Sequence, residues 1–187
     1  MFDLDDFLCR CSDAIAESEP RRATREVLSR ALAAPGEMAE VMAPREAGLT
    51  VLHQADDLTV LHVVWAPGMD IWPHDHRMWA VIGIYEGEED NTFYRRGGPD
   101  SRSLTASGGK RITKGDALLL GADTIHAVSN PRRGPTGAIH VYGGDLIGEP
   151  RSQWGPGPLE ERPYDIDQAR RQFAEANASW REGSSQR

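Results

Sequence analysis

Short segments rich in β-branched and aromatic residues follow one another along most of the chain, and this spacing constrains the fold more than any other feature. They are separated by Gly, Pro, Asp and Ser residues, which favour turns, and no helical pattern lies between them. Many short strands in this arrangement indicate a β-sandwich or barrel. The acidic sequence 86–90 and the glycine-rich sequence 107–109 are expected to form two of the turns. The predicted strands are 49–53, 58–65, 78–85, 92–95, 117–120, 125–129 and 137–142.

Helical patterns precede and follow this β region. Apolar residues at three- and four-residue intervals predict one helix over 4–15 and a second over 21–34, which Pro35 and Gly36 should end. A last helix is expected after the proline- and glycine-rich sequence that follows residue 154. The predicted organisation is one domain over 1–187, made of a helical segment (1–45), a barrel core (49–154) and a C-terminal helix (165–180).

Composition and charge exclude several classes of protein. The 187 residues carry 21 Lys and Arg against 29 Asp and Glu, whereas binding to nucleic acid depends on cationic side chains that neutralise phosphates. No apolar run approaches the roughly 20 residues of a membrane span, and the acidic N-terminus lacks the order of a signal peptide. Cys9 and Cys11 are too close for a mutual disulfide. We therefore expect a cytoplasmic protein, monomeric or homo-oligomeric, that binds neither nucleic acid nor membranes.

Three histidines in two glycine-marked segments carry the chemical signal. The segment 68–76 ends in His-Asp-His, and because residues two apart on a strand face the same way, His74 and His76 should point into one space. The segment 115–130 has the pattern of a strand, a tight turn and a second strand, which places His126 early on the returning strand. A barrel that brings these strands together would cluster three neutral nitrogen donors.

Each histidine also has a structural interpretation. A single histidine on a half-buried strand is more often a hydrogen-bonded structural residue than a ligand, and we apply this interpretation to His53 and His62. An isolated His-x-His sequence is also more often incidental than metal-binding. The combination of His-x-His with a distant third histidine, each in its own glycine-marked turn, favours a metal site.

Together the two segments resemble the two motifs of the cupin family, as Gly-x5-His-x-His and Gly-x5-Gly-x-Asp-x2-His-x3-Asn. The resemblance spans about residues 58–154. The common cupin pattern adds a glutamate soon after the second histidine, where this chain has Ala80 and Val81. A set without glutamate resembles the thiol dioxygenases, the group of cysteine and 3-mercaptopropionate dioxygenases. The resemblance implies a mainly β cupin barrel (double-stranded β-helix or jelly roll) with helices at both ends. It also implies Fe(II) held by the three histidines, although imidazoles also suit zinc, copper and nickel.

A further segment, 139–145, resembles the strand of that family that carries a histidine and a tyrosine beside the iron. His140 and Tyr142 face the same way on a strand, and the resemblance implies that they reach toward the open positions of the iron. The family's serine two residues before the histidine is Ala138 here, so the hydroxyl that would orient His140 is missing. Without the resemblance, a His-x-Tyr strand would be interpreted as core.

An arginine decides which thiol the resemblance implies. Family members that act on carboxylate-bearing thiols pair the carboxylate with a guanidinium, whose planar fork matches it. In cysteine dioxygenases that arginine lies on an early strand, but no arginine occurs here between Arg45 and Arg77. In 3-mercaptopropionate dioxygenases it follows the Tyr-Gly-Gly-Asp segment, and Arg151 fits that place. The alternative interpretation of Arg151 is a solvated loop residue.

The resemblance thus implies an iron-dependent dioxygenase that converts a small carboxylate-bearing thiol and O2 to the sulfinate, with 3-mercaptopropionate preferred to cysteine. His140 and Tyr142 are the expected catalytic residues, and Arg151 is the expected substrate-binding residue. Two alternatives stay open. One is a cupin metalloenzyme that acts on a non-thiol substrate, such as a carbon–carbon cleaving dioxygenase or an isomerase. The other is a non-catalytic cupin that only binds a ligand.

Overall fold

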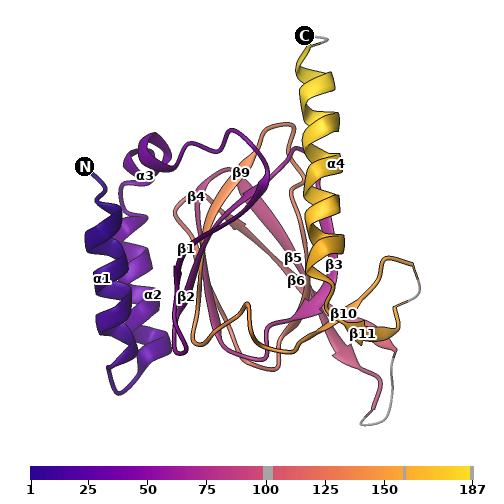
Figure 1. Ribbon diagram of the computed structural model, residues 1–187, viewed down its shortest axis with the longest axis horizontal. Helices are drawn as coiled ribbons and strands as arrows, with labels where there is room; N and C mark the ends of the chain where they lie inside the picture. Colours follow the sequence, from indigo (N-terminus) through magenta and orange to yellow (C-terminus); the bar gives the residue numbers. More distant parts are fainter. Residues whose placement is uncertain (99–102, 158, 186–187) are drawn as a thin grey trace.

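The computed structural model describes residues 1–98, 103–157 and 159–185, which form four helices and two antiparallel sheets (Figure 1). The helices are α1 (Leu4–Ile15), α2 (Pro20–Ala31), α3 (Pro35–Met42) and α4 (Ile166–Ser185). The first sheet has the order β1 (Gly48–Gln54), β2 (Thr59–Trp65), β9 (Thr136–Tyr142), β4 (Ala80–Glu86) and β7 (Ala117–Leu120). The second has the order β11 (Glu161–Pro163), β10 (Ser152–Trp154), β3 (Asp70–Asp75), β8 (Ile125–Ser129), β5 (Glu88–Arg96) and β6 (Leu104–Thr113).

Strands β2, β9 and β4 of the first sheet are buried on both faces, which explains why these strands are almost continuously apolar. Side chains on a strand alternate between faces. On β9, Ile139 and Val141 belong to the apolar cluster that includes the N-terminal helices. The alternate residues Ala138 and Tyr142 belong to the cluster between the two sheets. The first sheet therefore separates an apolar layer under the helices from the interior of the barrel.

The N-terminal helices cover the outer face of the first sheet, where α1 and α2 lie side by side in Figure 1. The side chain of Asp3 caps α1 by accepting a hydrogen bond from the backbone N–H of Asp6, at 3.1 Å. Gly83 of β4 allows α2 to approach closely, because a Cβ atom at this position would lie 2.7 Å from the side chains of Leu28 and Leu32. Close packing of α2 on β4 thus depends on this glycine.

Helix α4 stands on the opposite side of the molecule from α1 and α2 (Figure 1). The buried amide of Asn177 accepts a hydrogen bond from the N–H of Ala47 at 2.7 Å and donates one to its carbonyl at 2.8 Å. Phe173 of α4 stacks on Trp65 of β2, with ring centroids 5.4 Å apart. Helix α4 therefore brings an aromatic ring into the space between the sheets.

None of the helices in the described ranges has both the length and the hydropathy that a membrane span needs.

The structure corrects two predicted helix boundaries. The second helix ends at Ala31, and Pro35 begins α3 instead of ending α2. Proline is tolerated in the first turn of a helix, where its missing N–H would have no partner, so the same residue can start or stop one. The C-terminal helix, predicted to stop at residue 180, continues to Ser185.

Both sequences predicted as turns lie mostly within strands. Gly108 and Gly109 lie within β6, where pairing with β5 shifts between Phe93 and Tyr94. Glycine in a strand often marks such a bulge. In the acidic sequence 86–90, Gly87 separates β4 from β5, but β5 begins at Glu88, and Glu89 is fully buried. The prediction of a solvated acidic turn is therefore wrong.

Candidate metal centre

Three histidines from neighbouring strands of the second sheet converge in the barrel interior. His74 in β3 lies opposite His126 in β8, and His76 follows the last residue of β3. One ring nitrogen of each lies within 4.8 Å of the other two, and all three side chains are buried. Within the described part of the chain, no carboxylate or thiol belongs to this group. The group can hold a metal ion through three nitrogen donors.

A proline explains how β3 presents these side chains. Proline lacks an N–H for the sheet, so inside a sheet it occurs at edges or bulges. Pro73 lies on a strand flanked by β10 and β8, and the pairing with β8 shifts between Ile71 and His74. The carboxylate of Asp75 pairs with Arg77 at 2.7 Å and accepts a backbone hydrogen bond at 2.7 Å, outside the histidine group. The alternation predicted for His-Asp-His is therefore present.

Hydrogen bonds decide where two of the three rings carry their proton. Nδ1 of His74 lies 3.1 Å from the carbonyl oxygen of Trp72, which only accepts, so this nitrogen donates. Nδ1 of His126 lies 2.7 Å from Oδ1 of Asn91 and donates likewise. Both rings then keep a lone pair on Nε2 for a metal. Nε2 of His76 is 3.4 Å from Nε2 of His126, and two lone pairs at this distance repel unless a proton or a cation lies between them.

Burial keeps the imidazoles neutral. Burial, together with the nearby charge of Arg151, lowers the pKa of His74 to about 4. Burial, followed by the neighbouring histidines, holds the pKa of His76 and of His126 well below the ordinary value of 6.5. Neutral imidazole is the form that binds metal ions, so near pH 7 the three rings can accept a metal ion without first losing protons.

His140 and Tyr142 face the histidine group from the first sheet. Nδ1 of His140 lies 2.9 Å from the hydroxyl of Tyr142, whose ring meets that of His76 edge-on with centroids 5.0 Å apart. Burial raises the pKa of Tyr142 well above its ordinary value and lowers that of His140 to about 3. The tyrosine is thus protonated and the histidine neutral near pH 7. Nε2 of His140 has no hydrogen-bond partner among the described residues. The structure brings the pair beside the metal group, and their catalytic role stays a prediction.

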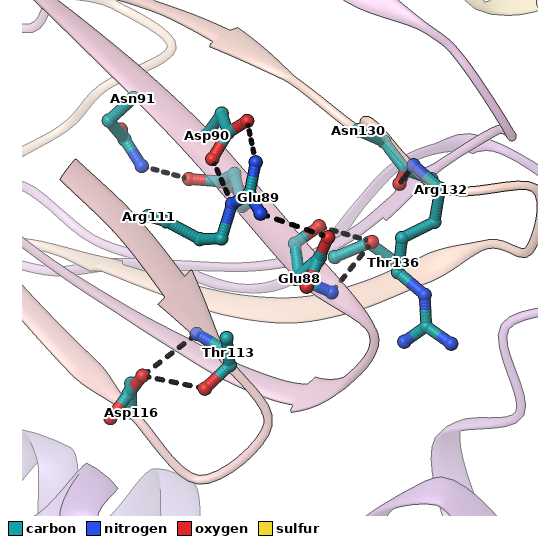
Figure 2. A network of polar contacts seen from close by, with 10 residues as sticks. All are labelled: Glu88, Glu89, Asp90, Asn91, Arg111, Thr113, Asp116, Asn130, Arg132 and Thr136. Carbon is teal, nitrogen blue, oxygen red and sulfur yellow. Dashed lines mark hydrogen bonds and ion pairs between the residues drawn. The ribbon is translucent and has the colours of Figure 1, made fainter. Parts of the chain in front are cut away.

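Two polar residues that the sequence analysis did not identify lie on the inner side of β5. The indole N–H of Trp65 donates to Oε2 of Glu89 at 2.9 Å. The amide of Asn91 donates to Oε1 of Glu89 at 2.9 Å, as Figure 2 shows. Burial raises the pKa of Glu89 to about 7, although both hydrogen bonds lower it. The two-residue spacing of Glu89 and Asn91 was the available signal, but the surrounding acidic residues indicated a turn instead.

Arg151 lies between two cavities. The inner one, of about 40 Å³, is lined by the three histidines together with His140, Tyr142 and Arg151. The outer one, of about 570 Å³, lies between β1, the segment after β9 and α4. The guanidinium of Arg151 stacks over the ring of Tyr164, with its carbon 3.6 Å from the ring centroid. The residues that line both cavities are Leu49, Leu61, Leu146, Arg151, Tyr164 and Phe173.

His62 and Asn130, two further polar residues considered in the sequence, form hydrogen bonds away from the three-histidine group. His62 lies outside the three-histidine group and hydrogen-bonds the hydroxyl of Tyr85 at 2.7 Å. Asn130, the last residue of the second motif, donates to the carbonyl oxygen of Gly134 at 2.9 Å and accepts from the N–H of Arg132 (Figure 2). Asn130 thus stabilises the turn between β8 and β9.

The arrangement of strands was compared with known proteins. No protein-family model matches the chain. The protein BH2720 of Bacillus halodurans is 18% identical, with a TM-score of 0.50 over 71% of this chain and 90% of that one. A cupin superfamily protein of Desulfitobacterium hafniense is 20% identical, with a TM-score of 0.44 over 58% of this chain and 88% of that one. A Klebsiella pneumoniae protein with a double-stranded β-helix domain is 17% identical, with a TM-score of 0.43 over 55% and 76% of the two chains. Such likeness concerns the fold alone. The two antiparallel sheets, with helices before and after them, confirm the predicted mainly β fold class.

Proposed function

We propose that this protein is an iron-dependent dioxygenase that oxidises a small carboxylate-bearing thiol, such as 3-mercaptopropionate, to its sulfinate. The observation that carries the proposal is a three-histidine group without a carboxylate that shares one small cavity with Tyr142 and Arg151. In the overall reaction RSH and O2 give RSO2H. Both oxygen atoms bond to sulfur, which loses the four electrons that O2 gains, so no further reductant is needed.

The donor set fits a ferrous ion. Three neutral imidazoles would hold Fe(II) without offsetting its charge, and they would leave coordination positions for a substrate. Bound iron would supply oxygen activation and would favour the thiolate form of the substrate. The same imidazoles suit other transition metals, so the choice of iron rests on the resemblance to thiol dioxygenases.

Arg151 is suited to bind the carboxylate of the substrate. Its guanidinium lines the inner cavity, and no carboxylate pairs with it within the described ranges. Stacking on Tyr164 holds the planar group in one orientation. A carboxylate at Arg151 would place the rest of a short substrate toward His74 and His76. The small volume of the inner cavity, about 40 Å³, favours a substrate with few heavy atoms.

Tyr142 is suited to donate a hydrogen bond inside the cavity. Burial keeps its hydroxyl protonated, and His140 holds the hydroxyl in place at 2.9 Å. Apolar neighbours such as Ile71 and Val128 line the same cavity and exclude water from it. The hydroxyl has a single proton, which it shares with Nδ1 of His140; when this proton turns toward the cavity, it can stabilise a developing negative charge on oxygen.

Oxygen uptake tests the proposal. The metal-free protein is loaded anaerobically with Fe(II) and mixed with 3-mercaptopropionate, cysteine or cysteamine. We expect the fastest uptake with 3-mercaptopropionate and a product heavier by two oxygen atoms, with no carbon–carbon bond cleaved. If none of the thiols stimulates uptake, the proposed activity is wrong. Metal binding without any turnover would favour the non-catalytic alternative.

Replacement of Arg151 tests the substrate anchor. Removing the guanidinium in Arg151→Ala should raise the KM for 3-mercaptopropionate by about 10–100-fold, because a charge-assisted hydrogen bond contributes roughly 1.5–3 kcal/mol. Cysteamine, which has no carboxylate, should show little change. The matched control is Arg170→Ala, which removes an arginine that lines only the outer cavity. Equal losses with both thiols would show that the carboxylate binds elsewhere.

A further inference from the structure

Glu89 is a carboxylate in the barrel interior for which the proposed reaction has no use. Its side chain is fully buried, and its oxygens accept hydrogen bonds from two neutral donors, Trp65 and Asn91. No lysine or arginine pairs with it in the part of the chain that the structure describes. Burying an ionisable group without a cation costs free energy, so Glu89 lowers the stability of the fold unless it is protonated.

Asn91 connects Glu89 to His126. An amide has one oxygen, which accepts, and one NH2 group, which donates. Because the ionised carboxylate only accepts, the NH2 group of Asn91 must face Glu89 when Glu89 is ionised, and its oxygen then faces Nδ1 of His126 at 2.7 Å. An oxygen acceptor at this position requires a proton on Nδ1 and leaves the lone pair on Nε2. The tautomer of His126 therefore depends on a residue two hydrogen bonds away.

We infer that Glu89 is a positioning residue: through Asn91 it fixes His126 in the tautomer that binds a metal, and it also orients His140. This inference rests on the metal site of the proposed function, but it does not depend on the substrate or on the chemistry with oxygen. Strand β5, which carries Glu89 and Asn91, pairs directly with β8, which carries His126.

The second oxygen of Glu89 acts on His140. Oε2 lies 3.9 Å from Nε2 of His140, which is too far for a hydrogen bond but close enough for the negative charge to favour an N–H there. With its proton on Nε2, His140 presents Nδ1 as an acceptor for the hydroxyl of Tyr142. The carboxylate of Glu89 thus determines which ring nitrogen carries the proton in His126, on the second sheet, and in His140, on the first.

The variant Glu89→Gln keeps the shape of the side chain and changes its hydrogen-bonding pattern. If the glutamine oxygen accepts from Trp65, its NH2 group faces Asn91. Turning the amide of Asn91 over then satisfies every group, because its oxygen accepts from the glutamine and its NH2 group donates to Nδ1 of His126. The proton of His126 moves to Nε2, where it blocks the metal.

We expect the Kd of the metal-free Glu89→Gln protein for Co(II), measured by calorimetry, to rise by about 10–100-fold. The matched control is Glu88→Gln, on the same strand, where the native side chain is near Arg111 of β6 (Figure 2). Its Kd should change less than about twofold. The conservative variant Glu89→Asp keeps an acceptor-only group and should bind Co(II) more tightly than Glu89→Gln. Imidazole ¹⁵N shifts should place the proton of His126 on Nδ1 in the native protein and on Nε2 in Glu89→Gln.

Native Co(II) affinity in Glu89→Gln, or lost affinity with the proton still on Nδ1, would overturn the inference. If Glu89→Gln does not fold, as judged by circular dichroism, Asn91→Ala removes the same acceptor from His126 and must raise the Kd as well. An unchanged Kd in that variant would also overturn it. Neither measurement uses a thiol or oxygen, so a protein that shows these changes but oxidises no thiol would refute the proposed function and support the role of Glu89.

Discussion

The layer between the N-terminal helices and the first sheet and the space between the two sheets are both buried, but they contain different residues. The cluster under the helices is apolar and includes Leu28, Val81 and Ile139. The space between the sheets has apolar walls, but it also holds four histidines and a glutamate. The same strand serves both regions, since Ile139 and His140 are neighbours on β9.

The two regions therefore contribute differently: the apolar layer under the helices stabilises the fold, and the space between the sheets holds the residues of the proposed site. Apolar burial under the helices favours folding by roughly 25 cal/mol for each Å² removed from water. Burial of imidazoles and of Glu89 works in the opposite direction, because polar groups leave water. The helix-covered layer therefore allows the barrel to hold a polar interior in which the metal group is formed before any ion binds.

The largest effect that we expect comes from a ligand in the interior. His76→Ala should weaken Co(II) binding by more than the roughly 10–100-fold typical of residues that only support ligands. The metal-free variant should still fold, because Nδ1 of His76 has no hydrogen-bond partner among the described residues and Nε2 has only the 3.4 Å contact with His126. Calorimetry and thermal unfolding check both parts. His62→Ala is the control, and a comparable loss of metal affinity there would contradict the assignment of the ligands.

A substitution in the layer under the N-terminal helices should lower the stability of the protein but leave its metal affinity unchanged. Leu28 is fully buried, so Leu28→Ala should lower the free energy of unfolding by about 2–5 kcal/mol, through lost apolar burial and the cavity left behind. Co(II) affinity of the folded variant should be unchanged. Urea unfolding measures the first quantity and calorimetry the second. The exposed Val41, replaced by alanine, should change stability by less than about 0.5 kcal/mol. Loss of metal affinity in Leu28→Ala would show that the two regions are coupled.

Lowering the pH should have a smaller effect on stability for each titrating group, and it should act through the buried histidines between the two sheets. The pKa values of His74 and His140 are lowered to about 4 and about 3, whereas in the unfolded chain they lie near 6.5. The unfolded chain then binds more protons, so the stability of the metal-free protein should fall as the pH drops below about 6.5. The slope is roughly 1.4 kcal/mol per pH unit for each such histidine.

Protonation of Glu89 has the opposite effect on how stability depends on pH. Its pKa is raised to about 7, so between about pH 4.5 and 7 the folded protein holds a proton that the unfolded chain releases. This contribution offsets about one histidine. Urea unfolding at several pH values should give a steeper slope for Glu89→Gln than for the native protein, and the same slope for Leu28→Ala as for the native protein. Stability that does not change between pH 6.5 and 5 would show that the interior imidazoles accept protons without cost.

Local patterns predicted the parts of the fold whose cause is local. The strands 117–120 and 125–129 have the predicted bounds, because short apolar runs and the turn between them are properties of neighbouring residues. The pairing of His74 with His76, and of His140 with Tyr142, follows from the two-residue period of a strand in the same way. The functions assigned to these residues stay predictions.

The period of a strand does not say which face becomes the interior. In the acidic run of β5, Glu89 is buried and Asp90 is paired with Arg111 at the surface, although both are acidic neighbours. The donor that accommodates Glu89, Trp65, lies 24 residues away in the sequence. Pro35 likewise starts a helix rather than ending one, because the chain has already left α2 before reaching it.

The sequence by itself determined the short strands, the flanking helices and the His74–His76 pair with its two-residue spacing and no nearby glutamate, because neighbouring residues specify these features. Tertiary structure decided that the rings of His74, His76 and His126 meet, that Arg151 stands between the inner and the outer cavity, and that Glu89 turns inward. The physical reason is that burial and hydrogen bonding are contacts between distant segments, so their free energy exists only once the two sheets have closed around the site.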